Sequence, residues 1–226
     1  MNTAILVDGA FFLHRYARCF PGGDTHSPEQ VAKALHKIAL QHCDGDLYRI
    51  FYYDCPPLQK KAQNPITRQP IDFSKTPAAI FRFGLFEELK KLRKVALRLG
   101  HLQGDMIWNI RPGRFRELVA GNITLQQLTA GDVFCDVRQK GVDMKLGVDV
   151  ATLALKRLVN RIVLIAGDAD FVPAAKFARR EGIDFVLDPM WNPVPASLFE
   201  HIDGLTSKCP RPVRPNHPPQ TPNSTP

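Results

Sequence analysis

The segment Ile162-Val-Leu-Ile-Ala-Gly-Asp168-Ala-Asp170-Phe171 ends a run of aliphatic residues with a glycine and two aspartates. Near the amino terminus, Ala4-Ile-Leu-Val-Asp8-Gly ends in the same way. Such runs, bounded by glycine, are typical of parallel strands that are buried on both faces of a sheet. Ligands of open α/β sheets bind at the carboxyl ends of these strands. We therefore expect Asp8 and Asp168 to lie at the same edge of one sheet.

A third acidic segment reads Lys140-Gly-Val-Asp143 and continues into Leu146-Gly-Val-Asp149. Asp143 is expected at the start of a helix over residues 142–158. Asp149 follows six residues later, which places it roughly 120° further around that helix. Because Asp149 lies among apolar residues, a buried carboxylate there needs a partner, either the site at the sheet edge or a nearby lysine.

Strand and helix patterns alternate along most of the chain, which predicts a mainly parallel sheet with right-handed crossovers. Three layers, α/β/α, are the expected architecture, as in Rossmann-like folds. At the start of the second helix, Ser27 is expected as the N-cap, with Pro28 at the first helical position. Strands are expected at residues 3–7, 48–53, 102–110, 133–138, 161–166 and 183–187, and helices at 10–19, 28–41, 78–99, 142–158 and 171–181.

The 226 residues suffice for a single α/β domain. We expect this domain to span residues 1–205, with an irregular, basic insertion at 55–132. The last segment, residues 206–226, contains seven prolines and almost nothing apolar, so a disordered tail is expected there.

The net charge of +8 is distributed unevenly. Residues 56–131 contain 13 basic and 5 acidic residues, whereas the segments that carry the aspartates are slightly acidic. An anionic polymer attracted by the insertion and cut at an acidic metal centre fits this division, because phosphate contacts supply most sequence-independent affinity. The alternative is that the basic residues only solvate exposed helices.

Cysteine usage and hydropathy indicate a cytoplasmic protein without a membrane partner. The five cysteines are scattered and show no CxxC spacing, which argues against a disulfide framework and a structural zinc site. No signal peptide is expected, and no apolar run approaches the length of a membrane span.

Val7-Asp8-Gly, Lys140-Gly-Val-Asp143 and Gly167-Asp168-Ala-Asp170-Phe171, in this order, resemble the NYN domain of the PIN-like nuclease superfamily. The chain is most similar to the bacterial LabA-like branch, over residues 1–54 and 133–190. Two positions depart from the pattern of many members, which have an asparagine where this chain has Phe11 and a serine where it has Ala166.

The resemblance implies a divalent-metal-dependent ribonuclease, expected to be an endoribonuclease. Hard cations prefer oxygen ligands, so carboxylates are the donors that such a centre requires. Asp143 and Asp170 each have an alternative interpretation as helix caps, and Asp8 could simply begin a turn. The expected ligands of Mg²⁺ or Mn²⁺ are Asp8, Asp143, Asp168 and Asp170, and Asp149 is added to the catalytic set.

The expected substrate is RNA, single-stranded or structured, and the sequence leaves a homodimer open. The basic helix at 78–99 and the arginine-rich stretch at 111–116 are predicted to form a wall of the substrate groove. Trp108 and Phe115 could stack on bases or could pack a small core of the insertion. The predicted nucleic-acid contacts are Lys90, Lys94, Arg111, Arg114, Arg116 and Lys140.

Other functions fit the sequence less well. A haloacid-dehalogenase-type phosphatase needs a second aspartate where this chain has Ala10, and neither a Gly-x-Gly-x-x-Gly nor a P-loop motif occurs. The remaining alternative is a non-catalytic regulatory module that binds RNA or protein. A pure binding surface gains nothing from clustered negative charge that faces phosphate, so we prefer the nuclease.

Overall fold

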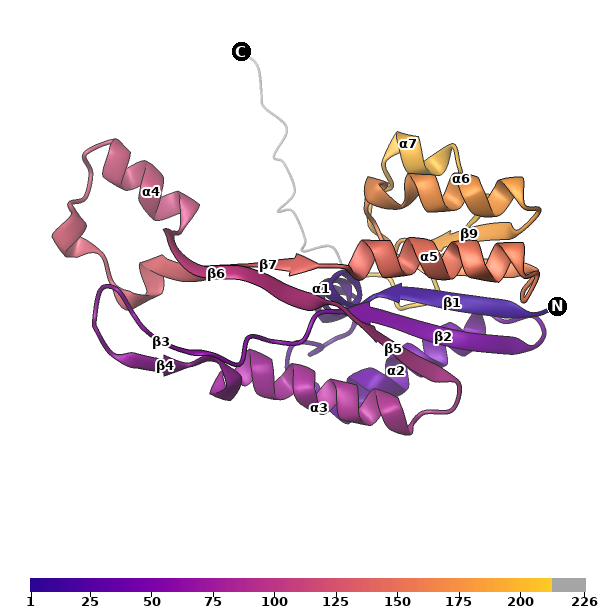
Figure 1. Ribbon diagram of the computed structural model, residues 1–226, viewed down its shortest axis with the longest axis horizontal. Coiled ribbons are helices and arrows are strands. Elements are labelled where there is room, and N and C mark those ends of the chain that lie inside the picture. Colours follow the sequence, from indigo (N-terminus) through magenta and orange to yellow (C-terminus); the bar gives the residue numbers. More distant parts are fainter. Residues whose placement is uncertain (213–226) are drawn as a thin grey trace, which may run out of the picture.

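In a computed structural model of the protein, residues 1–212 are described, without the side chains of residues 104 and 105. The centre is a six-stranded sheet in the order β10-β9-β8-β1-β2-β5, and its paired strands are parallel (Figure 1). This confirms the expected sheet. Its strands are β1 (Thr3–Asp8), β2 (Leu47–Asp54), β5 (Val95–Leu99), β8 (Arg161–Ile165), β9 (Asp184–Asp188) and β10 (Gly204–Leu205).

Helices cover both faces of the sheet, as the three-layer prediction requires. Figure 1 shows α2 and α3 along one face, α5 and α6 along the other, and α1 end-on beside the carboxyl end of β1. The helices are α1 (Gly9–Cys19), α2 (Pro28–Gln41), α3 (Pro77–Lys91), α5 (Val142–Leu155), α6 (Val172–Arg180) and the short α7 (Ala196–Phe199).

The central position of β1 in the sheet explains why its sequence is apolar without interruption. Ala4 and Leu6 enter the core under α5 and α6, whereas Ile5 and Val7 enter the core under α1, α2 and α3. Both faces of β1 are therefore buried. Val7 pairs with Tyr52 of β2 on one side and Ile165 of β8 on the other, so the carboxyl ends of these strands lie level with one another.

α2 begins as predicted, and α1 begins one residue earlier than expected, at Gly9. The Ser27 side chain and the Gln30 side chain form a reciprocal capping box, with Pro28 at the first helical position of α2. At the start of α1, the backbone of Gly9 lies against the Tyr52 ring, where an added Cβ would come within 2.6 Å of the ring.

The helix predicted over residues 78–99 was wrong in its second half. α3 ends at Lys91, Lys94 has a positive φ of 63°, and the chain then forms β5. Residues Val95–Leu99 pair with β2, and Gly100 donates to the Asp54 carbonyl at 2.8 Å. Aliphatic residues at 95, 97 and 99 fit a period of two as well as a helical stripe, and pairing with β2 decides between the two.

Most of the insertion forms an arm, which we define as residues 55–75 and 101–140. It contains an antiparallel ribbon of β6 (His101–Ile110) and β7 (Val133–Lys140), a hairpin of β3 (Lys61–Gln63) and β4 (Pro70–Asp72), and α4 (Pro112–Val119) near the tip. Figure 1 shows the arm extending away from the sheet. The strand expected at 133–138 therefore lies in this ribbon and not in the parallel sheet.

The arm has its own internal contacts. The Phe73 and Trp108 rings lie 6.2 Å apart, and Asn64 donates to the Ala130 carbonyl at 3.4 Å. Trp108 thus packs within the arm, whereas Phe115 on α4 is 54% exposed. Short 3-10 turns occur at Phe73–Lys75, Leu125–Gln127 and Ala130–Asp132 in the arm, and at Ala169–Phe171 after β8.

The first residues of the expected tail pack against the domain. The Thr206 amide donates to the Leu187 carbonyl at 3.0 Å, Trp191 donates to the Cys209 carbonyl at 2.9 Å, and Cys209 is buried. The rest of the predicted tail, residues 213–226, lies outside the described residues. All five cysteines are free thiols. Among the described residues, no helix is long and apolar enough to cross a membrane.

Candidate active site

Asp8 stands at the junction of β1 and α1. Its carboxylate accepts a hydrogen bond from the Phe11 amide at 3.1 Å, which caps α1. Burial raises the pKa of Asp8, hydrogen bonds from the Phe11 and Ala10 amides oppose this shift, and the nearby Asp143 and Asp54 carboxylates raise the pKa further. The site is therefore one in which negative charge is crowded.

Asp168 and Asp170 follow β8 at the same edge, and both are exposed. The Asp168 carboxylate accepts from the Asp170 amide at 3.3 Å and caps the 3-10 turn that precedes α6. Partial burial raises the pKa of Asp143, and the Asp170 and Asp168 carboxylates add to the shift. The fold thus gathers four of the predicted aspartates; with Asp54 we call them the acidic cluster.

The capping interpretation applies to different aspartates from those expected. Asp143 lies in the first turn of α5, but Gly141 is the N-cap and no side chain caps this helix. Gly141 has a φ of 82°, a backbone conformation that glycine adopts without strain. Within the acidic cluster, Asp8 and Asp168 form caps, and their carboxylates remain partly or fully exposed.

Asp149 is held by residues other than the acidic cluster. It accepts hydrogen bonds from Arg98 Nε and from the Tyr53 hydroxyl, both at 2.8 Å. The expectation that this carboxylate needs a partner is met, but the partner is an arginine of β5 together with a tyrosine of β2. Asp149 thus has a structural explanation, and its catalytic role stays a prediction.

Sequence reasoning missed Asp54 and Arg82. Asp54 ends β2 and is fully buried, and Arg82 of α3 donates to it at 2.7 Å. Burial raises the pKa of Asp54, whereas the Arg82 guanidinium and the Cys55 amide lower it. The signal was present, because Ile50–Asp54 is a buried run that ends in aspartate, as Ala4–Asp8 does.

Phe11 occupies a position next to the acidic segment after β8. A Cβ added to Gly167 would lie 2.4 Å from the Phe11 ring, so only glycine fits at 167 while this ring keeps its place. Phe11 stands where many NYN domains carry an asparagine. The cluster is therefore bordered by an aromatic ring where those proteins present a polar amide.

The predicted basic contacts fall into three places. Lys140 ends β7 and is exposed, three residues before Asp143 in the chain. Arg111, Arg114 and Arg116 lie near the tip of the arm, where Arg114 is paired with Asp132 at 2.9 Å and with Glu117 at 2.6 Å. Arg116 is exposed, and Arg111 donates to the Gly131 carbonyl at 2.8 Å.

Lys90 and Lys94 lie at the other end of the sheet. Lys94 donates to the carbonyl of Leu47, the first residue of β2, whereas Asp54 is the last. A strand of this length separates its ends by roughly 25 Å. Lys90 pairs with Glu87 at 2.6 Å near the end of α3. The structure therefore does not bring these two lysines to the acidic cluster.

The donor chemistry of the acidic cluster suits a hard divalent cation. Within residues 1–212, no group of three or more His, Cys, Asp or Glu side chains is arranged to hold a metal ion. Mg²⁺ commonly takes only one or two carboxylates and keeps several waters. Burial is the main cause of the raised pKa values of Asp8 and Asp143, and repulsion from neighbouring carboxylates, which a cation would relieve, adds to it.

The parallel six-stranded sheet, covered by helices on both faces, is consistent with a PIN-like α/β fold. The profile of the NYN domain family matches residues 85–192, which supports assignment of the chain to that family. The matched range contains Asp143, Asp168 and Asp170.

No curated protein matches the chain. Among solved structures, a protein of unknown function from Vibrio parahaemolyticus aligns over 92% of each chain, with 13% sequence identity and a TM-score of 0.45. A likeness at this level carries no argument about function.

Proposed function

We propose that this protein is a divalent-metal-dependent ribonuclease of the LabA-like branch of NYN domains, which hydrolyses internal phosphodiester bonds. The observation that carries the proposal is the acidic cluster, in which aspartates from β1, α5 and the turn after β8 lie close together at one edge of the sheet, so that burial and the neighbouring carboxylates raise the pKa values of Asp8 and Asp143. Crowded carboxylates are costly without a counter-charge, and a metal centre supplies one.

Asp8, Asp143, Asp168 and Asp170 would hold Mg²⁺ or Mn²⁺. The bound ion would activate a water and stabilise the charge that develops on the attacked phosphate. The chain's own contribution is positional, because the Phe11 amide fixes the Asp8 carboxylate and the Asp170 amide fixes that of Asp168. Asp54 is neutralised by Arg82 and adds to the field around Asp8.

Lys140 and the arm would attract RNA toward the cluster. Lys140 is exposed one residue before Gly141, and Arg116 is exposed on α4. Positive side chains beside an acidic centre supply the phosphate contacts that the aspartates cannot make. Trp108 packs against Phe73, so Phe115 is the aromatic residue of this region that is free to meet a base.

The test is cleavage of end-labelled single-stranded RNA, hairpin RNA and single-stranded DNA with Mn²⁺, Mg²⁺ or EDTA. Asp168→Asn should lower cleavage by at least about 100-fold while thermal unfolding and RNA binding change little, since Asp168 is exposed. Asp46→Asn is a suitable control, because Asp46 is exposed and directly precedes β2 at the opposite edge of the sheet. Undiminished cleavage by Asp168→Asn would contradict the assignment of Asp168 to the metal centre.

A non-catalytic module is the second candidate function, and the Phe11 position favours it. An aromatic ring against Gly167 replaces an amide that could orient water or metal. Salt-sensitive RNA binding without metal-dependent cutting, unaffected by Asp168→Asn, is the result that this candidate predicts.

A further inference from the structure

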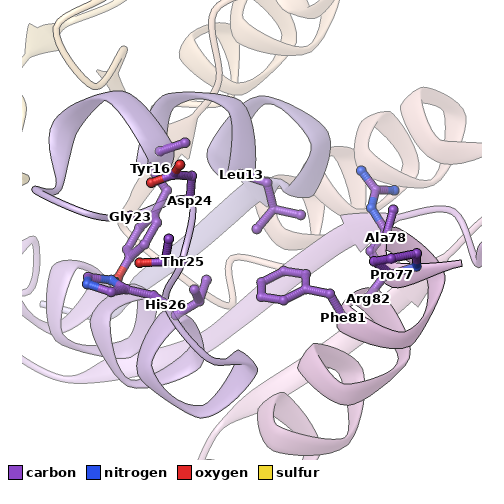
Figure 2. Close-up of a pocket in the computed structure, with 12 residues that line it drawn as sticks. Leu13, Tyr16, Gly23, Asp24, Thr25, His26, Pro77, Ala78, Phe81 and Arg82 are labelled. Carbon is purple, nitrogen blue, oxygen red and sulfur yellow. The ribbon is translucent and has the colours of Figure 1, made fainter. Parts of the chain in front are cut away.

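A pocket of 530 Å³ opens between α1, the loop at residues 23–26 and the first turns of α3 (Figure 2). Its volume lies in the range of sites for small organic ligands. The pocket lies beside the acidic cluster and is not part of it.

The middle of the pocket is apolar. Figure 2 shows the Leu13 side chain directed toward the Phe81 ring. Val31, Ala17 and Ala78 also line the pocket. Phe81 and Leu13 are both partly exposed, so their side chains are available to a ligand. A flat, uncharged ring would fit between them and would remove apolar surface from water.

Arg82 connects the pocket to the acidic cluster. Arg82 lines one end of the pocket, and its guanidinium donates to the buried Asp54 carboxylate at 2.7 Å. Among the described residues, Asp54 is the one acceptor of the Arg82 side chain, which remains 25% exposed. The other N–H groups of this guanidinium can therefore meet an anionic group that lies between the pocket and the cluster.

The opposite end of the pocket is polar. Figure 2 places Asp24, Thr25 and His26 at this end, away from Arg82. His26 Nδ1 lies 2.8 Å from the Tyr16 hydroxyl, which holds the imidazole in place. A ligand that fits the whole pocket thus combines an anion, a flat ring and a polar ring edge, in that order.

From this order we infer that the pocket binds one unpaired nucleotide of the substrate RNA. The base stacks on Phe81 beside Leu13, and its phosphate meets Arg82 next to the acidic cluster. This inference rests on the proposed function, which supplies RNA as the bound polymer. Binding of a base in the pocket can nevertheless be tested without cleavage. The experiment must distinguish a base from two other occupants, a protein segment and a small apolar molecule.

The experiment measures the affinity of fluorescein-labelled single-stranded RNA in EDTA, with Asp168→Asn as the parent. Phe81→Ala should weaken binding by about 5- to 10-fold, since stacking of one base contributes at least that much. Ala78→Trp fills the pocket from an exposed helical position and should weaken binding to a similar extent. Phe83→Ala is the matched control, because Phe83 packs against the same core but does not line the pocket.

An RNA series with a single abasic site at each position then identifies the base. One abasic position should weaken binding to the parent by a similar factor and have no further effect on Phe81→Ala. Unchanged affinity of both pocket variants, or an equal loss for a fully paired duplex, would overturn the inference and favour another occupant. Parent protein that binds no RNA would overturn it as well.

These results are separable from the ribonuclease test. Wild-type protein that never cuts RNA, but whose pocket variants lose single-strand affinity, supports the pocket and rejects the nuclease. Metal-dependent cutting that is lost in Asp168→Asn, with full RNA affinity in Phe81→Ala and Ala78→Trp, supports the nuclease and rejects the pocket.

Discussion

At the scale of single residues, the Arg82–Asp54 pair should be essential for stability. Arg82→Met would leave the fully buried Asp54 carboxylate unpaired, so we expect the free energy of unfolding to fall by about 3 kcal/mol. Adding Asp54→Asn should restore much of the loss, because the uncompensated charge is removed. Urea denaturation of the two single variants and the double variant measures this. A loss below about 1 kcal/mol in Arg82→Met would show that Asp54 finds another partner.

A second prediction at the scale of single residues concerns Asp132, which directly precedes β7 in the arm. Hydrogen bonds from the Thr129 amide and from Arg114 hold the pKa of Asp132 at about 2, below its ordinary value of 3.8. A carboxyl whose pKa is lowered in the folded state stabilises that state above its unfolded pKa. This stabilisation should be lost as the pH falls from about 4 to about 2.

Unfolding of the arm, followed by Trp108 fluorescence in a Trp191→Phe background, should therefore depend on pH in that window. Asp132→Asn should destabilise the arm at neutral pH and remove most of this dependence. Asp136→Asn, at an exposed position on β7, is the control. Parallel pH profiles for Asp132→Asn and the parent would contradict the assignment.

At the scale of elements, the junction between α3 and β5 carries a residue in an unfavourable conformation. Lys94 has a φ of 63°, and Lys94→Gly should raise the free energy of unfolding by about 0.5–1 kcal/mol. RNA affinity should not change, because Lys94 lies at the amino end of the sheet. Denaturation and filter binding test both parts. Weaker RNA binding by the variant would instead show that Lys94 contacts RNA, as the sequence predicted.

The elements also show what local sequence could predict. The strands β1, β2, β8 and β9 and the aspartates that follow β1 and β8 were predictable, because buried parallel strands are continuous apolar runs that end at a ligand-binding edge. β5 could not be predicted, because its alternation of apolar and other residues also fits the apolar stripe of an amphipathic helix. Asp54 was overlooked although it ends such a run, because its partner Arg82 lies 28 residues away and leaves no local signal.

At the scale of the whole molecule, the proposed function places RNA attraction on the arm, apart from the acidic cluster. Its two strands meet in register at Ile110 and Val133, so residues 111–132 can be replaced by an Asn-Gly turn without disturbing the ribbon. The fold should survive, and the plot of log affinity against log salt should become less steep by about 1 to 2, since Arg111 and Arg116 are lost. Lys90→Ala should leave the slope unchanged.

An unaltered slope after removal of the tip would show that α4 does not contact RNA. The arrangement of the arm could not be predicted from sequence, because β6 pairs with β7 across more than 20 intervening residues and neither strand carries a turn signal for the other. Its positive charge could be predicted from composition alone.

The contact between Phe11 and Gly167 has a consequence for how related chains diverge. The two positions are 156 apart in the sequence, yet a Cβ at 167 and a ring at 11 cannot occupy the same space. A lineage that acquires a small residue at 11 is released from the requirement for glycine at 167, and one that keeps the ring is not. The two positions should therefore covary, and a survey of relatives would show whether this corner of the site evolves as one unit.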